Sequence, residues 1–260
     1  MTVKKVFVLD GGTLPMPHEW LTYSVGKERG SYPAAIYQVY CETTEGKVLI
    51  DTGYRPDGPI AKLLSPAQQS QDQLIVNQLA MIGVKPGDID IVINSHLHGD
   101  HAGNNGLFTN ATFIVQRAEM RYAYAPLPHL GEMGYSRDDF DHRDLKYELV
   151  DGDWQVVEGI ETIFTPGHTP GHQSIIITTG KGNAFILPFD ALIIREQVTK
   201  PWIGPWEGPY VCMGYLYNLE DSYKSIYRLL NLAKTRNAQI WFGHDRPFFD
   251  TAKKVPDYYE

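Results

Sequence analysis

Short runs of β-branched and aromatic residues, separated by turns rich in Gly, Pro and Asp, dominate the first two thirds of the chain. Such runs are typical of β-strands. We therefore predict strands at Val3–Leu9, Ala35–Cys41, Lys47–Ile50, Asp90–Asn94, Thr112–Val115, Ile160–Phe164, Gln173–Thr178, Ala184–Leu187 and Gln239–Phe242. Gly180 and Gly182 between two of these strands indicate a hairpin.

Apolar residues recur at helical spacing in three other segments. Ser70–Ile82 keeps its apolar residues on one face, and Ser70 and Gln73 stand at the offset of a capping box. A short helix is predicted at Arg117–Tyr124, and Asn218 can cap a longer helix near the C-terminus. Strands that alternate with helices in this way predict an α/β fold.

Two segments, Ala125–Leu145 and Arg195–Tyr217, do not follow this alternation, because they are rich in Pro, Gly and aromatic residues. Loops of this length in a compact domain are usually functional, for example as a lid or a substrate wall. A packed structural insertion is the alternative. No linker or low-complexity segment interrupts the sequence, so we expect a single domain over residues 1–260.

Composition restricts the class of protein. The 260 residues are 43% hydrophobic, which suffices for a sizeable core, and the net charge of −8 without a basic run argues against nucleic-acid binding. No apolar run is long enough to cross a membrane, and the first apolar stretch ends at Asp10, too early for a signal peptide. Cys41 and Cys212 lie far apart and predict no disulfide framework, so we expect a cytoplasmic protein.

Four candidate metal ligands follow the strand that ends at Asn94. They form the pattern HxHxDH, made of His96, His98, Asp100 and His101. Imidazole and carboxylate groups suit zinc, iron, cobalt or manganese. A single tetrahedral ion does not need so many ligands so close together, so the pattern indicates two neighbouring ions.

Other strand ends carry similar side chains. The sequence TPGHTPGH follows the strand Ile160–Phe164 and contains His168 and His172. Asp190 follows an apolar strand, and His244 follows the last predicted strand. In α/β folds the loops at one edge of a sheet converge, so we expect these residues to share one site.

These motifs resemble those of the metallo-β-lactamase superfamily, and more narrowly those of the N-acyl homoserine lactonases, a family of quorum-quenching lactone hydrolases. The likeness extends from Leu49–Gly53 to Gly243–Asp245 and includes Asn110–Glu119 and Ile163–Ser174. The resemblance implies an αββα four-layer sandwich of the metallo-β-lactamase type, with a dinuclear site at one edge of the sheets.

The resemblance also implies a role for each candidate ligand. His96, His98 and His168 would bind one divalent ion. Asp100, His101 and His244 would bind the other, and Asp190 would bridge the two. Zinc is the first choice of metal, with iron, cobalt and manganese as alternatives. Asp51 and His172 are expected behind the ligands, where Asp51 would accept the free ring N–H of a ligand histidine.

The implied activity is hydrolysis of a lactone ring, with N-acyl homoserine lactones as the first choice of substrate. Two neighbouring ions can share a hydroxide that attacks the carbonyl, and they can polarise that carbonyl. Asp100 or Asp190 would act catalytically by passing a proton to the leaving alkoxide.

One position departs from the family pattern. A Tyr commonly stands three residues after the bridging Asp and hydrogen-bonds the substrate, but this chain has Ile193 there. Either Tyr210, Tyr215 or Tyr217 of the long loop forms this hydrogen bond instead, or the substrate differs. We assign substrate contact to Ile193, Trp202, Trp206 and Tyr210. Ordinary packing of these rings is an equal alternative.

Other activities of the superfamily share the metal motif. A glyoxalase-II-like thioesterase, or another carboxylic ester hydrolase, also carries HxHxDH and stays open. A phosphodiesterase would need a basic groove, a β-lactamase commonly uses a Cys ligand, and a redox di-iron protein replaces a motif His by a carboxylate. A non-catalytic metal-binding protein has little reason to retain seven ligands. We expect a small-molecule lactone as partner, without nucleic acid or membrane, and leave a homodimer open.

Overall fold

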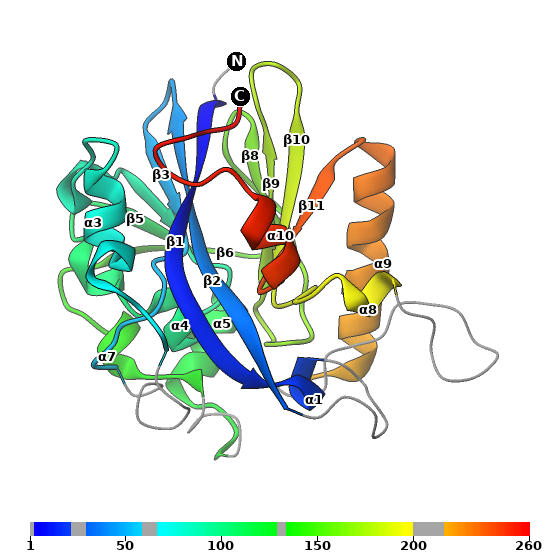
Figure 1. Cartoon of the computed structure of the whole chain (residues 1–260). Helices are drawn as coiled ribbons and strands as arrows, with labels where there is room; N and C mark the ends of the chain where they lie inside the picture. Colours follow the sequence, from blue (N-terminus) through cyan, green and yellow to red (C-terminus); the bar gives the residue numbers. More distant parts are fainter. Residues whose placement is uncertain (1–2, 22–29, 59–66, 129–133, 200–215) are drawn as a thin grey trace.

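Two mixed β-sheets lie face to face in the computed structural model of the chain, and helices cover their outer faces (Figure 1). The structure describes residues 3–21, 30–58, 67–128, 134–199 and 216–260. In this described part, no helix combines the length and the apolar character needed to span a membrane.

The first sheet has six strands in the order in which they occur along the chain. They are β1 (Val3–Pro17), β2 (Ser31–Thr43), β3 (Lys47–Ile50), β4 (Ile91–Ile93), β5 (Thr112–Gln116) and β6 (Lys146–Val150). The β1–β2 and β2–β3 pairs are antiparallel, whereas β3 to β6 run parallel to one another. The carboxyl ends of β3, β4, β5 and β6 therefore meet at the same edge of this sheet.

The second sheet has five strands in the order β11-β10-β9-β8-β7. They are β7 (Trp154–Val157), β8 (Ile160–Phe164), β9 (Gln173–Thr178), β10 (Ala184–Phe189) and β11 (Gln239–Phe242). The β9–β10 pair is antiparallel, as the two glycines between these strands predict. Strand β11 pairs parallel with β10, so the carboxyl ends of these two strands lie side by side.

The helices connect or flank these strands. They are α1 (His18–Leu21), α3 (Ile75–Ala80), α4 (Gly99–Ala102), α5 (Arg117–Tyr124), α7 (Arg137–Phe140), α8 (Glu196–Thr199), α9 (Leu219–Thr235) and α10 (Arg246–Thr251), with 3-10 turns at Gln71–Gln73, Pro86–Asp88 and Asn105–Leu107. In Figure 1, α3 lies outside the first sheet and α9 lies outside the second.

Three apolar layers hold these elements together. Val39 and Ile175 belong to the layer between the sheets, which also contains the fully buried Trp241. Leu79 of α3 packs in a second layer against the outer face of the first sheet, and Ile226 of α9 packs in a third against the second sheet. This arrangement confirms the predicted α/β class and the αββα sandwich, and burial of apolar surface is its main stabilising contribution.

Most predicted elements are present, and several have the predicted bounds, among them β3, α5, β8, β9 and β11. The helix predicted at Ser70–Ile82 is interrupted, and only Ile75–Ala80 within it is α-helical. Leu74 is extended, with ψ of 134°, and separates a 3-10 turn from α3. The Asn77 and Gln78 side chains donate to carbonyl oxygens of the first turn, and Gln78 Oε1 accepts the Asp10 N–H. These side-chain contacts replace the backbone hydrogen bonds of a continuous helix.

The predicted surface excursion at Ala125–Leu145 contains the short helix α7, and two strands that follow it, β6 and β7, have no counterpart in the prediction. Both strands lie at an edge of their sheet. Edge strands carry polar residues on their exposed sides, so their sequences lack the apolar runs on which strand prediction depends.

The predicted cap of α9 provides a test of this framework. Asn218 Oδ1 accepts the Asp221 N–H at 3.1 Å. Replacing Asn218 by Ala should lower the free energy of unfolding by about 1 kcal/mol. N218D should retain most of that stability, because aspartate caps equally well. Urea unfolding of the metal-free variants measures the difference, and an N218A protein as stable as the wild type would contradict the assignment of the cap.

Candidate metal centre

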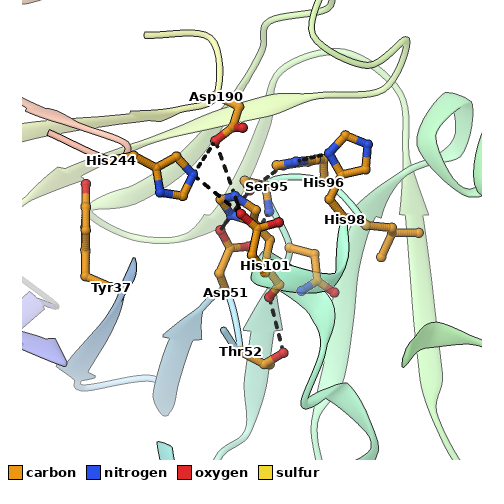
Figure 2. A network of polar contacts seen from close by, with 12 residues as sticks. Tyr37, Asp51, Thr52, Ser95, His96, His98, His101, Asp190 and His244 are labelled. Atoms are coloured by element: carbon orange, nitrogen blue, oxygen red, sulfur yellow. Dashed lines mark hydrogen bonds and ion pairs between the residues drawn. The ribbon is translucent and has the colours of Figure 1, made fainter. Parts of the chain in front are cut away.

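The ends of five strands meet where the two sheets adjoin, and each is followed by residues with imidazole or carboxylate groups. Asp51 follows β3, His96 and His98 follow β4, Asp100 and His101 begin α4, His168 follows β8, Asp190 follows β10, and His244 follows β11. Figure 2 shows six of these side chains, those of Asp51, His96, His98, His101, Asp190 and His244, gathered in one place. Residues far apart in the sequence thus form one buried polar cluster.

Within this cluster, three groups have ligand atoms close enough together to hold a metal ion. They are His96 with His98 and His168, Asp100 with His101 and His244, and His96 with His101 and Asp190. We call the first the three-histidine group and the second the Asp100 group. Asp190 lies between them. Its Oδ2 is 3.3 Å from His168 Nε2, and its Oδ1 is 3.2 Å from the Nε2 atoms of both His101 and His244.

In the three-histidine group, ring nitrogens converge. His98 Nδ1 lies 3.0 Å from His96 Nε2 and 3.1 Å from His168 Nε2. Burial and the neighbouring imidazoles hold the pKa values of His96 and His98 well below the ordinary histidine value. Neutral imidazole is the form that binds metals. Nitrogens bound to a common tetrahedral ion at about 2.0–2.1 Å lie about 3.3 Å apart, so this group fits a divalent ion closely.

In the Asp100 group the pKa values of the histidines are raised rather than lowered. Burial lowers the pKa of His101, but the carboxylates of Asp100, Asp190 and Asp51 outweigh this effect and raise it well above the ordinary value. Burial also lowers the pKa of His244, and Asp190 and Asp100 likewise raise it overall. Although Asp190 Oδ1 lies 3.2 Å from His101 Nε2 and from His244 Nε2, none of these three buried atoms forms a hydrogen bond with the described residues. A bound cation would satisfy all three atoms, so this group also fits a metal ion.

Hydrogen bonds behind the cluster orient its rings. Asp51 Oδ2 lies 2.8 Å from His101 Nδ1, which turns the other nitrogen of that ring toward Asp100 and Asp190. The same carboxylate accepts the Ser95 N–H and O–H. His244 Nδ1 lies 2.8 Å from the backbone oxygen of Ala35, which fixes that ring in the same way.

The backbone at two of the strand ends is strained. Asp51 and Phe189 have positive φ values of 57° and 44°, a region that few residues other than glycine occupy. Phe189 directly precedes Asp190, and its carbonyl oxygen would lie 2.5 Å from a Cβ on Gly243. Residue 243 must therefore be glycine for β10 and β11 to end so close together. Strain of this kind concentrates at functional sites.

The structure brings all seven predicted ligands together as buried side chains. His172 lies behind them, with its ring centre 5.2 Å from that of His96 and its Nδ1 2.9 Å from Thr165 Oγ1, and burial lowers its pKa to about 3. Ile193 is buried in an apolar cluster that includes Tyr54 and Ile194. The other predicted substrate contacts, Trp202, Trp206 and Tyr210, lie outside the described residues.

Two residues near the cluster have no counterpart among the predicted site residues. Tyr135 packs its ring against His98, with 4.6 Å between ring centres, although it belongs to the predicted surface excursion. Glu119 of α5 is buried and accepts a hydrogen bond from Tyr135. A glutamate in the first turn of a helix is ordinarily a solvent-exposed residue that favours the helix dipole, so the sequence alone gave no reason to place Glu119 in the interior.

Known proteins similar to this chain include members of a superfamily of metal-dependent enzymes. The sequence profile described as the metallo-beta-lactamase superfamily matches residues 32–232. The chain belongs to the metallo-β-lactamase superfamily. The match includes every candidate ligand of this superfamily member except His244, which lies beyond the matched range.

Individual relatives show to which family within this superfamily the chain belongs. An N-acyl homoserine lactonase of Bacillus thuringiensis is 32% identical over 270 aligned residues, which cover 99% of this chain and 100% of that protein. The N-acyl homoserine lactonase AttM of Rhizobium radiobacter is 37% identical and covers 73% of this chain and 70% of its own length. A solved N-acyl homoserine lactone hydrolase with N-hexanoyl-L-homoserine bound at the catalytic metal centre has a TM-score of 0.83 and 30% identity, covering 100% of both chains. The chain therefore also belongs to the N-acyl homoserine lactonase family.

The paired groups predict two metal ions per chain. Elemental analysis of metal-saturated protein should find two divalent ions, because the three-histidine group and the Asp100 group each offer a complete set of ligands. Removing the ions with a chelator should lower the unfolding temperature, since ligands that bind only the native state stabilise it. A content of one ion or none at saturation would contradict this prediction.

Asp190 and His172 should differ in their effect on metal content. Asp190→Ala removes the carboxylate between the two groups and leaves two cations unshielded from each other, so we expect loss of at least one ion and collapse of activity. His172→Ala should lose less metal than Asp190→Ala, because His172 belongs to none of the three groups. Elemental analysis of both variants measures the difference, and equal metal loss would contradict the placement of His172 behind the ligands.

Proposed function

We propose that this protein is a metal-dependent hydrolase that opens the lactone ring of N-acyl homoserine lactones. The observation that carries the proposal is the placement of Asp190 between two groups of buried metal-binding side chains. Family membership over the whole chain supports the substrate class, because its relatives include enzymes described as N-acyl homoserine lactonases and a structure with an opened product bound.

We propose that His96, His98 and His168 hold one ion, that Asp100, His101 and His244 hold the other, and that Asp190 bridges them. Nitrogen and carboxylate oxygen donors without a thiolate suit zinc, our first choice, as well as iron, cobalt and manganese. Two such ions, when bound, activate water near neutral pH and polarise a carbonyl group.

The protein's own residues orient this chemistry. Asp51 and the backbone oxygen of Ala35 hold the rings of His101 and His244, so their free nitrogens stay directed at the cluster without rearrangement during the reaction. The side chains of the cluster are buried, and burial strengthens the electrostatic interactions between them.

A proton must reach the oxygen of the leaving alcohol when the ring opens. Both oxygens of Asp190 face histidine nitrogens, whereas Asp100 meets His101 and His244 through Oδ2. We therefore assign the proton transfer to Asp100, whose carboxylate would take the proton from the attacking water and release it to the alcohol oxygen.

The substrate pocket departs from the pattern of the family at Ile193. An Ile side chain cannot form a hydrogen bond with the substrate. The loss of one such bond typically costs about 0.5–1.5 kcal/mol of free energy. This reduces the efficiency of a lactonase without removing the activity. We retain Trp202, Trp206 and Tyr210 as predicted contacts for the acyl chain or ring, and we propose a single-domain cytoplasmic enzyme.

A side-by-side assay tests the proposed function. Metal-loaded protein should hydrolyse N-acyl homoserine lactones, and the same preparation should be offered simple γ- and δ-lactones, a glutathione thioester and a phosphodiester. Asp100→Asn protein serves as the control for contaminating activity. Rapid turnover of the thioester or phosphodiester, with no opening of any lactone, would overturn the lactonase proposal and leave a dinuclear hydrolase of another class.

A further inference from the structure

The carboxylate of Glu119 lies fully buried behind the metal centre, with 0% of the residue exposed. Its Oε1 accepts the Leu97 N–H at 3.0 Å and the Tyr135 O–H at 2.8 Å. Its Oε2 accepts the Thr169 O–H at 2.6 Å and the Gly171 N–H at 3.2 Å. All four donors are neutral groups, and they come from three segments that are far apart in the sequence. One side chain thus joins three loops.

The donors lie beside histidines of one group only. Leu97 stands between His96 and His98 in the sequence, and Thr169 directly follows His168. The carboxylate therefore sets the spacing between the loop that carries His96 and His98 and the loop that carries His168. These are the two loops whose ring nitrogens meet in the three-histidine group.

The third segment fixes the ring of His98 from outside. Tyr135 packs edge-on against that ring and forms an isolated backbone bridge with residue 98. A Cβ on Gly134 would lie 2.4 Å from the ring, so the chain passes as close to His98 as a backbone can. The hydroxyl of Tyr135 ends on Glu119, which ties this packing to the same carboxylate.

The Asp100 group has a buried carboxylate of its own. Asp51 contacts the ring of His101 and both donors of Ser95, as described above. Asp51 thus contacts His101 directly and reaches the three-histidine half only through Ser95 Oγ, which lies 3.0 Å from His96 Nδ1. The donors to Glu119 all lie in the loops around the three-histidine half. Such supporting partners of metal ligands typically change metal affinity by about 10- to 100-fold when they are removed.

We propose that Glu119 is a positioning residue that sets the geometry of the three-histidine half of the metal centre, an inference that rests on the ligand sets of the proposed function. Glu119 touches no ion and no reacting atom. It acts through Leu97, Thr169 and Tyr135, whose hydrogen bonds hold the ligand loops at the separation that one ion requires.

The Glu119→Gln substitution isolates this role, because it keeps the volume of the side chain. Glutamine has one acceptor oxygen and one donor amide group in place of two acceptor oxygens. The hydroxyls of Thr169 and Tyr135 can rotate to accept a hydrogen bond, but the N–H groups of Leu97 and Gly171 cannot. At least one buried backbone N–H is therefore left unpaired, and the loop that contains it must shift.

The experiment measures binding of cobalt(II) to each half separately, by absorption spectroscopy in competition with a chelator. His244→Ala leaves the three-histidine half intact, and His98→Ala leaves the Asp100 half intact. Adding Glu119→Gln should weaken cobalt binding by about 10- to 100-fold in the His244→Ala background. In the His98→Ala background it should change the affinity by less than about threefold, because the hydrogen bonds of Glu119 go to no residue of the Asp100 group. Glu119→Gln should change the cobalt spectrum only in the His244→Ala background.

Two further variants serve as controls. Glu148→Gln, an exposed position on β6, should leave cobalt binding unchanged in both backgrounds. Tyr135→Phe keeps the ring against His98 and removes one donor, so it should weaken the three-histidine half alone, by a smaller factor. If circular dichroism shows that the Glu119→Gln protein does not fold, the Tyr135→Phe variant tests the positioning role in its place. Equal losses in both backgrounds, or no loss in the His244→Ala background, would overturn the proposal.

This measurement requires no lactone. If the variants behave as expected and wild-type protein opens no lactone, the proposed function fails and the positioning role of Glu119 stands. If lactones are hydrolysed and the cobalt affinities do not follow the expected pattern, the role of Glu119 is refuted and the lactonase proposal stands.

Discussion

Asp190 lies between two groups of histidines, with one carboxylate oxygen 3.2 Å from the Nε2 atoms of His101 and His244 and the other 3.3 Å from His168. Burial raises the pKa of Asp190, but the surrounding imidazoles outweigh it and hold the pKa well below the ordinary value. A buried anion of this kind is stable only beside positive charge. The contacts of Asp190 therefore constrain everything around it, because the ends of strands from both sheets must meet within bonding distance of one carboxylate.

The fold satisfies this constraint with local features that would otherwise destabilise it. Positive φ angles at Asp51 and Phe189 turn the chain sharply at two strand ends, and the absence of a side chain at Gly243 lets β10 and β11 end in contact. The apolar layer between the sheets, which includes Trp241, stabilises the molecule as a whole and compensates for this strain. Buried carboxylates behind the cluster then fix the loops that carry the ligands.

Much of this arrangement can be predicted from the sequence, and what cannot has physical reasons. Apolar runs locate most strands, and the spacing HxHxDH identifies a metal motif because it is a local pattern. The break at Leu74 depends on contacts with Asp10 of a distant strand, so helical periodicity could not reveal it. The burial of Glu119 likewise depends on donors from three other loops. Tertiary contacts of this kind leave no periodic signal in the chain.

The central claim, that Asp190 bridges two metal ions held by separate groups, is tested most directly by anomalous scattering from crystals of metal-loaded protein. The account predicts two peaks about 3.5–4 Å apart. One should lie within bonding distance of His96, His98 and His168, the other within bonding distance of the Asp100 group, and Asp190 should contact both. A single peak, or two peaks of which Asp190 contacts only one, would contradict the account.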